Sequence, residues 1–115
     1  MPKIISKSKI LILFACILFI YACGGISVPD DKKTYIGQWQ GLGMTLTITP
    51  DGGVAYKRVG KVTKSFNGPL QSFEGNDFKA GVGCISTTFV VSKAPYQDGG
   101  TWKMVVDGVE MTRVR

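Results

Sequence analysis

TWKMVVDGVEMTRVR, residues 101–115, contains two runs of apolar and β-branched residues on either side of Asp107-Gly108. An Asp-Gly pair flanked by such runs is the strongest short-range signal for a β-hairpin closed by a two-residue type I′ turn. Counting outward from the turn pairs the two runs and places Trp102 opposite Arg113 on one face. We therefore expect the Arg113 guanidinium to stack on the Trp102 indole in a cation–π contact that has a structural role.

Upstream of this hairpin, glycine recurs at steps close to eight residues: Gly43, Gly52, Gly60, Gly68, Gly75, Gly83, then Gly100 and Gly108. Such a step accommodates one short strand and one turn, and the double step after Gly83 accommodates a longer strand and a loop. Residues 44–49 (MTLTIT) alternate apolar and polar side chains, which is typical of a half-buried strand. The sequence predicts an all-β fold, an antiparallel meander of about eight short strands over residues 34–115 forming a small barrel or strongly curved sheet.

The interior of this sheet is expected to be filled by side chains. A barrel of about eight strands has room for packed side chains or for one small ligand. Seven large aromatic residues are available to fill it: Trp39, Tyr56, Phe66, Phe73, Phe78, Phe89 and Trp102. A packed interior is therefore expected rather than a ligand cavity.

Residues 1–22 are expected to form a signal-peptide helix. Three lysines precede Ile10–Ala22, a run of thirteen residues without a charge. A membrane-spanning helix needs about 20 apolar residues, so this run matches the apolar region of a secretion signal. Removal of the three lysines with the signal lowers the formal net charge from +6 to +3, which is too small to indicate a nucleic-acid partner.

The run ends in Ile20-Tyr21-Ala22-Cys23, which resembles the lipobox of bacterial lipoproteins. The resemblance implies cleavage before Cys23 and acylation of that cysteine by a diacylglyceryl thioether and an N-acyl chain, with fatty acids such as palmitate. Gly24, in place of an aspartate, implies the periplasmic face of the bacterial outer membrane. Alternatives are a second box at Leu13–Cys16, a plain signal peptide, and an uncleaved anchor.

Residues 24–33 (GGISVPDDKK) contain two glycines, one proline and four charges without periodicity. Together with Cys23, they are predicted to form a flexible tether that reaches about 33 Å when extended. After the tether, Gly37-Gln38-Trp39 resembles the G-x-W motif of lipocalins. This resemblance implies that Trp39 closes one end of a barrel, with Arg113 or Arg115 packed across it.

Catalytic chemistry has few candidate residues in this chain. Histidine is absent, which removes the side chain most used for proton transfer near neutral pH. Most carboxylates adjoin glycine or asparagine in predicted turns or lie in the tether, and the serines lack a histidine partner. We expect no enzyme, no cofactor and no metal site.

Four cations, Lys57, Arg58, Lys61 and Lys64, surround Gly60. A two-residue Gly60-Lys61 loop would place Lys57 opposite Lys64, and an anion or an acidic partner would relieve their repulsion. The alternatives are a charged hairpin tip that prevents edge-to-edge aggregation, or a three-residue loop that separates the lysines.

Two further features are candidates. Residues 93–100 form the longest expected loop, and Pro95, Tyr96, Gln97 and Asp98 within it are candidate contact residues. Alternatively, Tyr96 folds back over a barrel end. Cys84, at the start of a predicted strand, is expected to be a buried, structural thiol, with a reactive or intermolecular thiol as the alternative.

These features together predict a non-catalytic outer-membrane lipoprotein whose periplasmic β-domain binds an envelope protein. The chain would contact the membrane through the lipid anchor at Cys23. One alternative is a small lipid- or ligand-binding, lipocalin-like barrel. Another is an inhibitor or immunity protein directed against a cell-wall hydrolase, although fold alone does not establish activity.

Overall fold

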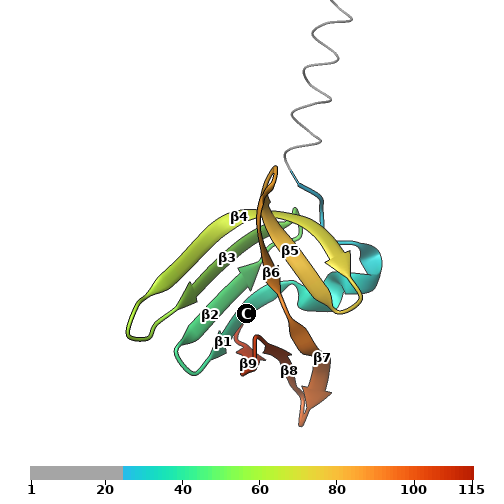
Figure 1. Cartoon of the computed structure of the whole chain (residues 1–115). Helices are drawn as coiled ribbons and strands as arrows, with labels where there is room; N and C mark the ends of the chain where they lie inside the picture. The colour runs from blue at the N-terminus through green and yellow to red at the C-terminus, as the bar shows by residue number, and fades with distance from the viewer. Residues whose placement is uncertain (1–24) are drawn as a thin grey trace, which may run out of the picture.

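A computed structural model describes residues 25–115. Over these residues the chain forms one sheet of nine antiparallel strands, curled into a half-barrel, with one short helix (Figure 1). The predicted all-β meander with a strongly curved sheet is confirmed. The expected signal peptide and Cys23 lie outside the described residues.

A 3₁₀ helix, η1 (Asp30–Tyr35), precedes the strands β1 (Gly37–Gly41), β2 (Met44–Ile48), β3 (Gly53–Arg58), β4 (Lys64–Glu74), β5 (Asp77–Val82), β6 (Ile85–Phe89), β7 (Val91–Asp98), β8 (Thr101–Val106) and β9 (Val109–Arg113). Their order in the sheet is β6-β5-β4-β3-β2-β1-β9-β8-β7. Strands that are adjacent in the sheet are thus also consecutive in the chain, with the exception of the β1–β9 pair. The two edge strands, β6 and β7, are separated in the chain by Val90 alone.

The β8–β9 hairpin has the register expected from its turn. Asp107 and Gly108 both have positive φ, 49° and 78°, as a type I′ turn requires. Met104 pairs with Met111, and both side chains are buried. Strand β2 likewise shows the predicted alternation, with its three apolar residues buried and its threonines on the other face.

The double step between Gly83 and Gly100 contains two strands, so the expected single strand and loop are wrong there. The chain crosses from one sheet edge to the other at Val90, whose N–H donates to the Asp107 carboxylate (2.9 Å). The Asp107 N–H donates in return to the Val90 carbonyl (2.7 Å). The Val91 N–H donates to the Asp77 carboxylate (2.8 Å). The carboxylates of Asp107 and Asp77 thus fix the backbone on both sides of the crossing. The sequence around Val90 does not indicate this role.

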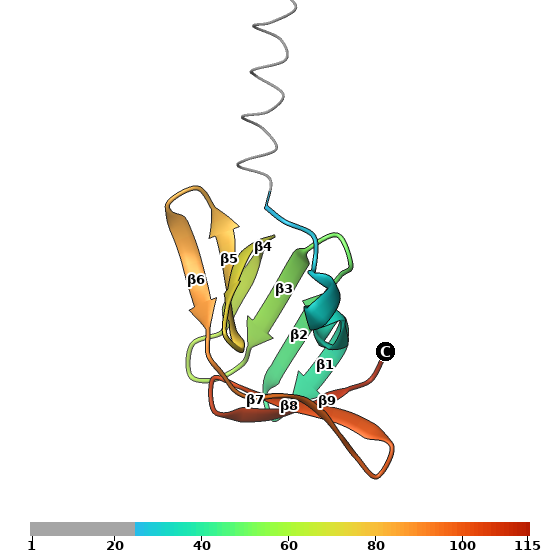
Figure 2. The ribbon, with the colours of Figure 1, turned by 90° about the vertical axis from the view of Figure 1, so that its right-hand side faces the viewer.

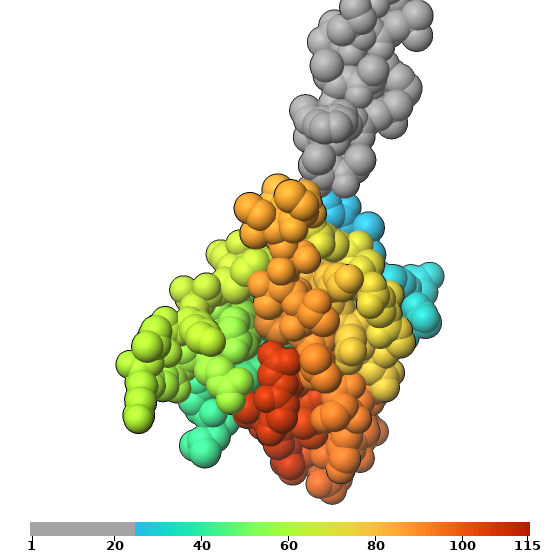
Figure 3. All heavy atoms as spheres, in the orientation of Figure 1, coloured from blue at the N-terminus to red at the C-terminus, as the bar shows by residue number. Residues whose placement is uncertain are grey.

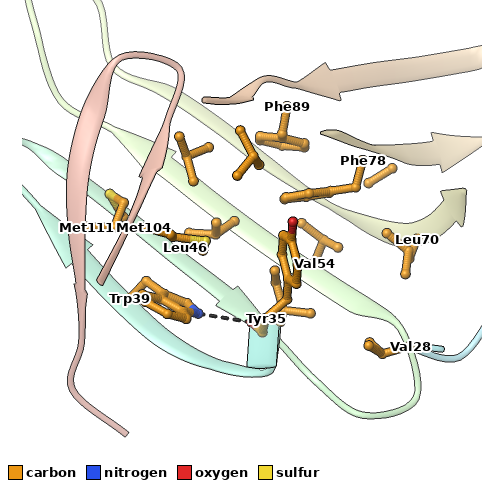
Figure 4. Packing of buried hydrophobic residues seen from close by; sticks show 14 of the residues in the cluster. Val28, Tyr35, Trp39, Leu46, Val54, Leu70, Phe78, Phe89, Met104 and Met111 are labelled. Atoms are coloured by element: carbon orange, nitrogen blue, oxygen red, sulfur yellow. Dashed lines mark hydrogen bonds between the residues drawn. The ribbon is translucent and has the colours of Figure 1, made fainter. Parts of the chain in front are cut away.

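Aromatic and aliphatic side chains fill the concave side of the sheet (Figure 4). Trp39, Tyr35, Phe78 and Phe89 are almost completely buried. The rings of Phe78 and Phe89 stack with their centroids 4.8 Å apart. The other four predicted aromatics are partly buried and pack against this cluster: Tyr56, Phe66, Phe73 and Trp102. The described part of the chain therefore has a packed interior.

The segment predicted as a flexible tether is instead bonded to the sheet from Ile26 onward (Figure 2). The Ile26 N–H donates to the Leu70 carbonyl (2.9 Å), and the Val28 N–H donates to the Pro50 carbonyl (3.1 Å). The Val28 side chain is buried. Gly52 permits this approach, because a Cβ atom there would lie 1.8 Å from the Ile26 carbonyl oxygen. The composition of residues 24–33 gave no sign that the main chain of Ile26 and the side chain of Val28 contact the sheet.

Tyr35 connects η1 to the core and supports a pH-dependent prediction. Its hydroxyl donates to the Asn76 carbonyl (2.9 Å), and burial, followed by the nearby charge of Asp77, raises its pKa above the ordinary 10.0. We expect Tyr35→Phe to lower the free energy of unfolding by about 1 kcal/mol at pH 7, because one hydrogen bond is lost. Above pH 10.0 the unfolded tyrosine ionises before the folded one, so the wild type loses stability that the variant retains.

Urea denaturation of both proteins between pH 7 and pH 11 measures this difference. The gap in unfolding free energy between wild type and Tyr35→Phe should narrow as the pH rises above the ordinary tyrosine pKa of 10.0. A gap that stays constant over the whole range would show that the Tyr35 hydroxyl is not protected from ionisation in the folded state.

Candidate functional site

Arg113 lies between the two tryptophans of the described domain. Its guanidinium carbon is 5.0 Å from the Trp102 ring centroid and 5.7 Å from that of Trp39. It also donates to the Ile36 carbonyl (3.4 Å). The predicted contact with Trp102 is confirmed, and Arg113, rather than Arg115, packs across Trp39. Arg115 contributes its main-chain carbonyl, which accepts from the Gln38 N–H (2.9 Å). This cluster joins the first and last strands and has a structural role.

The basic hairpin between β3 and β4 differs from the prediction. Pairing ends at Arg58 opposite Lys64, and residues 59–63 form a five-residue loop. Lys57 lies opposite Ser65, so the predicted Lys57–Lys64 pair is wrong. The loop is longer because the Val59 N–H donates to the Gly43 carbonyl in the adjacent β1–β2 turn (2.8 Å). A contact with a different hairpin thus ends the β3–β4 pairing early.

The four cations are not brought into one site. Arg58 and Lys64 line an open hollow of about 420 Å³ that also includes Phe89 and Asp107. Lys57 lines a separate hollow of about 400 Å³, next to the β1–β2 turn. Lys61 lies in the loop. None of the four forms an ion pair with any residue in 25–115. The predicted anion site is therefore reduced to the Arg58 and Lys64 pair.

The predicted contact loop at residues 93–100 is wrong, because Pro95, Tyr96, Gln97 and Asp98 belong to β7. Tyr96 pairs with Lys103 and is half-buried. The Lys103 ammonium lies 3.6 Å from the Asp98 carboxylate and 3.3 Å from that of Glu110. The hydrogen bond and the charge of Glu110, followed by the charge of Asp98, raise the pKa of Lys103. These side chains are tied to the last hairpin, and only the Gly99-Gly100 turn remains outside a strand.

Cys84 is exposed in the turn between β5 and β6, so its predicted burial is wrong. The error has a simple cause. Strand β6 lies at the edge of the sheet, and its residues from Ile85 to Thr88 are exposed, so that only Phe89 reaches the core. The prediction assumed that the strand after Cys84 packs against the core, whereas this strand, β6, forms the edge of the sheet.

The edge formed by β6 is the feature that sequence reasoning missed. It pairs only with β5, in an unbroken register from Ile85 to Phe89. Residues 80–92 form a run of thirteen residues without a charged side chain. That run, placed between Lys79 and Lys93, was the available signal. The structure leaves most of it exposed.

The opposite edge, β7, is constructed differently. It contains Lys93 and Pro95, and its pairing with β8 shifts register twice, between Val91 and Lys93 and between Lys93 and Tyr96. Charges, prolines and bulges are the devices with which natural sheets prevent unwanted strand addition at an edge. The β7 edge carries all three, whereas β6 carries none.

Within residues 25–115, no three potential metal-ligating side chains of His, Cys, Asp or Glu lie close together. No helix in this range has the length and apolar character needed to cross a membrane. Comparison of the chain with models of protein families, with curated proteins and with solved structures finds no match.

Proposed function

We propose that the chain is a non-catalytic lipoprotein of the bacterial outer membrane, anchored through Cys23 on the periplasmic face, whose β-domain binds an envelope protein by adding a strand to β6. The anchor rests on the lipobox resemblance at Ile20–Cys23. The binding mode rests on the contrast between a protected edge, β7, and an unprotected edge, β6. Strand addition supplies main-chain hydrogen bonds to a partner without the need for a pocket.

The composition of β6 indicates what kind of segment it would accept. Ser86, Thr87 and Thr88 are exposed and uncharged, and β-branched residues favour the extended backbone. The Phe89 end adjoins the hollow with Arg58 and Lys64. An extended segment with hydroxyl or aliphatic side chains along β6 and a carboxylate near Phe89 would complement both features.

The packed interior supports binding at the sheet edge over binding inside the barrel. The concave side is occupied by buried apolar side chains, including Phe78 and Phe89. The hollow beside Phe89 is open to solvent. A small-molecule ligand generally requires a concave site that encloses most of its surface, which an open hollow provides poorly.

The test places a photoreactive amino acid at Thr87 of the full-length chain in intact cells. We expect a discrete covalent adduct with one envelope protein after irradiation. The matched control places the same amino acid at Gln97, an exposed residue of β7, and should give no discrete adduct. In a second arm, Ser86→Lys with Thr88→Lys charges the β6 edge and should abolish the Thr87 adduct.

Two results would contradict this function. Equal adducts from Thr87 and Gln97 would mean that the β6 edge has no preferred partner. An adduct that survives both lysine substitutions would mean that the contact does not use the edge of β6. Both lysines replace exposed side chains, so circular dichroism of the purified variant should be unchanged.

A further inference from the structure

The turn of the β5–β6 hairpin exposes apolar side chains. Val82 and Ile85 are 59% and 78% exposed, and the turn residues Gly83 and Cys84 between them are also exposed. We refer to Val82–Ile85 as the apolar tip. Isolated exposed apolar residues are common on soluble proteins, but a hairpin turn with no polar side chain is not the usual composition of a turn.

The apolar tip lies beside the start of the described chain. Strand β4 contacts both: its Leu70 carbonyl accepts from the Ile26 N–H (2.9 Å), and its Gln71 side chain donates to the Gly83 carbonyl (3.0 Å). Figure 1 shows the β5–β6 turn and the start of the described chain, drawn in blue, at the same end of the molecule, and Figure 3 shows that the turn projects from the surface there. Ile26, which is 40% exposed, adds a further apolar side chain at this end.

The position of Cys23 determines what faces this end. Only Gly24 separates Cys23 from the described residues, and a residue spans at most about 3.6 Å. Because Ile26 is already bonded to Leu70, no tether remains to hold the domain away from an acylated Cys23. The surface around Gly25 would then lie at the lipid head groups.

We propose that the apolar tip is a second membrane contact, which enters the head-group region of the membrane that holds Cys23 and fixes the orientation of the domain. This inference rests on the proposed lipid anchor. Apolar side chains that reach this region gain free energy in proportion to the area removed from water. In both ribbon views the basic β3–β4 loop lies well below the β5–β6 turn, at the side of the molecule, so that it would be held away from this membrane (Figures 1 and 2).

The orientation has a consequence for the β6 edge. Strand β6 starts at the apolar tip and ends at Phe89, which is in the core. With the tip at the membrane, the free edge would rise from the lipid surface. A partner segment would approach it from the side, where neither the lipid nor the rest of the sheet blocks access.

Cys84 provides a probe position for the test. In the mature chain Cys16 is removed with the signal and Cys23 is acylated, so that Cys84 is the one free thiol. The purified, acylated protein is labelled at Cys84 with an environment-sensitive fluorophore and reconstituted in vesicles of phosphatidylethanolamine and phosphatidylglycerol. We expect a blue-shifted emission, about threefold brighter than in detergent-free buffer, that is quenched by nitroxide-labelled lipid.

The matched control moves the same probe to the β3–β4 loop, well away from the apolar tip. In Cys84→Ser with Lys61→Cys, the fluorophore lies in the β3–β4 loop and should emit as in water, without quenching by labelled lipid. A third variant, Ile85→Asp with the probe on Cys84, adds a charge to an exposed position and should reduce the blue shift and the quenching severalfold.

The outcomes separate the two proposals. If mass spectrometry shows acylated Cys23 while the Cys84 and Lys61→Cys probes are equally exposed to water, the membrane contact is overturned and the anchor stands. A blue shift unchanged by Ile85→Asp would also overturn the contact. If Cys23 carries no lipid, both the anchor and the contact are overturned.

Discussion

Trp39→Ala is expected to lower the free energy of unfolding by about 3–5 kcal/mol, a loss typical of truncating a fully buried aromatic side chain. Trp39 is 0% exposed, and its indole N–H donates to the Tyr35 carbonyl (3.0 Å). Truncation would leave a cavity beneath β1 and would remove one ring from Arg113. Chemical denaturation monitored by far-ultraviolet circular dichroism measures the change.

Trp102→Ala is the matched control for this prediction. Trp102 also contacts Arg113 but is only half-buried, so its truncation should cost less, about 1–2 kcal/mol. Equal losses for the two variants would mean that Arg113, and not burial, determines the contribution of both rings. A negligible loss for Trp39→Ala would contradict the burial of Trp39 in the core.

The position of Trp39 explains why the expected loss is large. In the described sheet, β1 and β9 are the only paired strands that lie far apart in sequence, and Trp39 pairs there with Arg113. The Val114 N–H and the Gln38 carbonyl extend this pairing (2.7 Å). Contacts between distant parts of a chain cost more loop-closure entropy than those within hairpins. The apolar contacts of Trp39 offset that cost at the single non-local seam of the described sheet.

Elements defined by local chemistry could be predicted from the sequence. Asp107-Gly108 determined its hairpin because few residues tolerate two consecutive positive φ angles, and the register followed by counting. The alternation in residues 44–49 determined β2 and its buried face in the same way. In both cases the signal lies within the segment that it describes.

The errors occurred where a distant contact determines the conformation. Residues 24–33 have the composition of a tether, but Ile26 and Val28 are held by carbonyls of Leu70 and Pro50. Lys57 would face Lys64 in the shortest hairpin, but a bond from Val59 to Gly43 ends the pairing earlier. None of these partners can be identified from the segment itself.

Whether a strand lies at the edge or in the middle of the sheet also could not be predicted from the sequence of that strand. Pro95 and Gly99-Gly100 indicated a loop, because proline and glycine usually interrupt strands. At a sheet edge, proline is tolerated, and β7 is such an edge. The prediction that Cys84 is buried was wrong for the same reason, because β6, which follows Cys84, is the other edge of the sheet.

Cys23→Ser is expected to abolish metabolic labelling with palmitate and to move the protein from the membrane fraction to the soluble periplasmic fraction. The thiol is the atom to which the lipobox resemblance assigns the diacylglyceryl group. Each buried methylene of an acyl chain contributes about 0.8 kcal/mol to membrane binding, so several chains give a stable anchor. The apolar tip, with two large side chains, could not replace it. Labelling and fractionation of cells that express each variant measure both effects.

The other two cysteines provide the controls, because the chain contains three in all. Cys16→Ser should be labelled and fractionate as the wild type does, since Cys16 would be removed with the signal peptide. Cys84→Ser should also be labelled normally, because its thiol is far from the lipobox in sequence.

If Cys16→Ser alone lost its label, the processed box would be Leu13–Cys16, and the product would retain seven more residues before Cys23. Those residues would form a linker between the lipid and the sheet, which is absent when Cys23 is the acylated residue. The apolar tip would then no longer be held at the membrane surface.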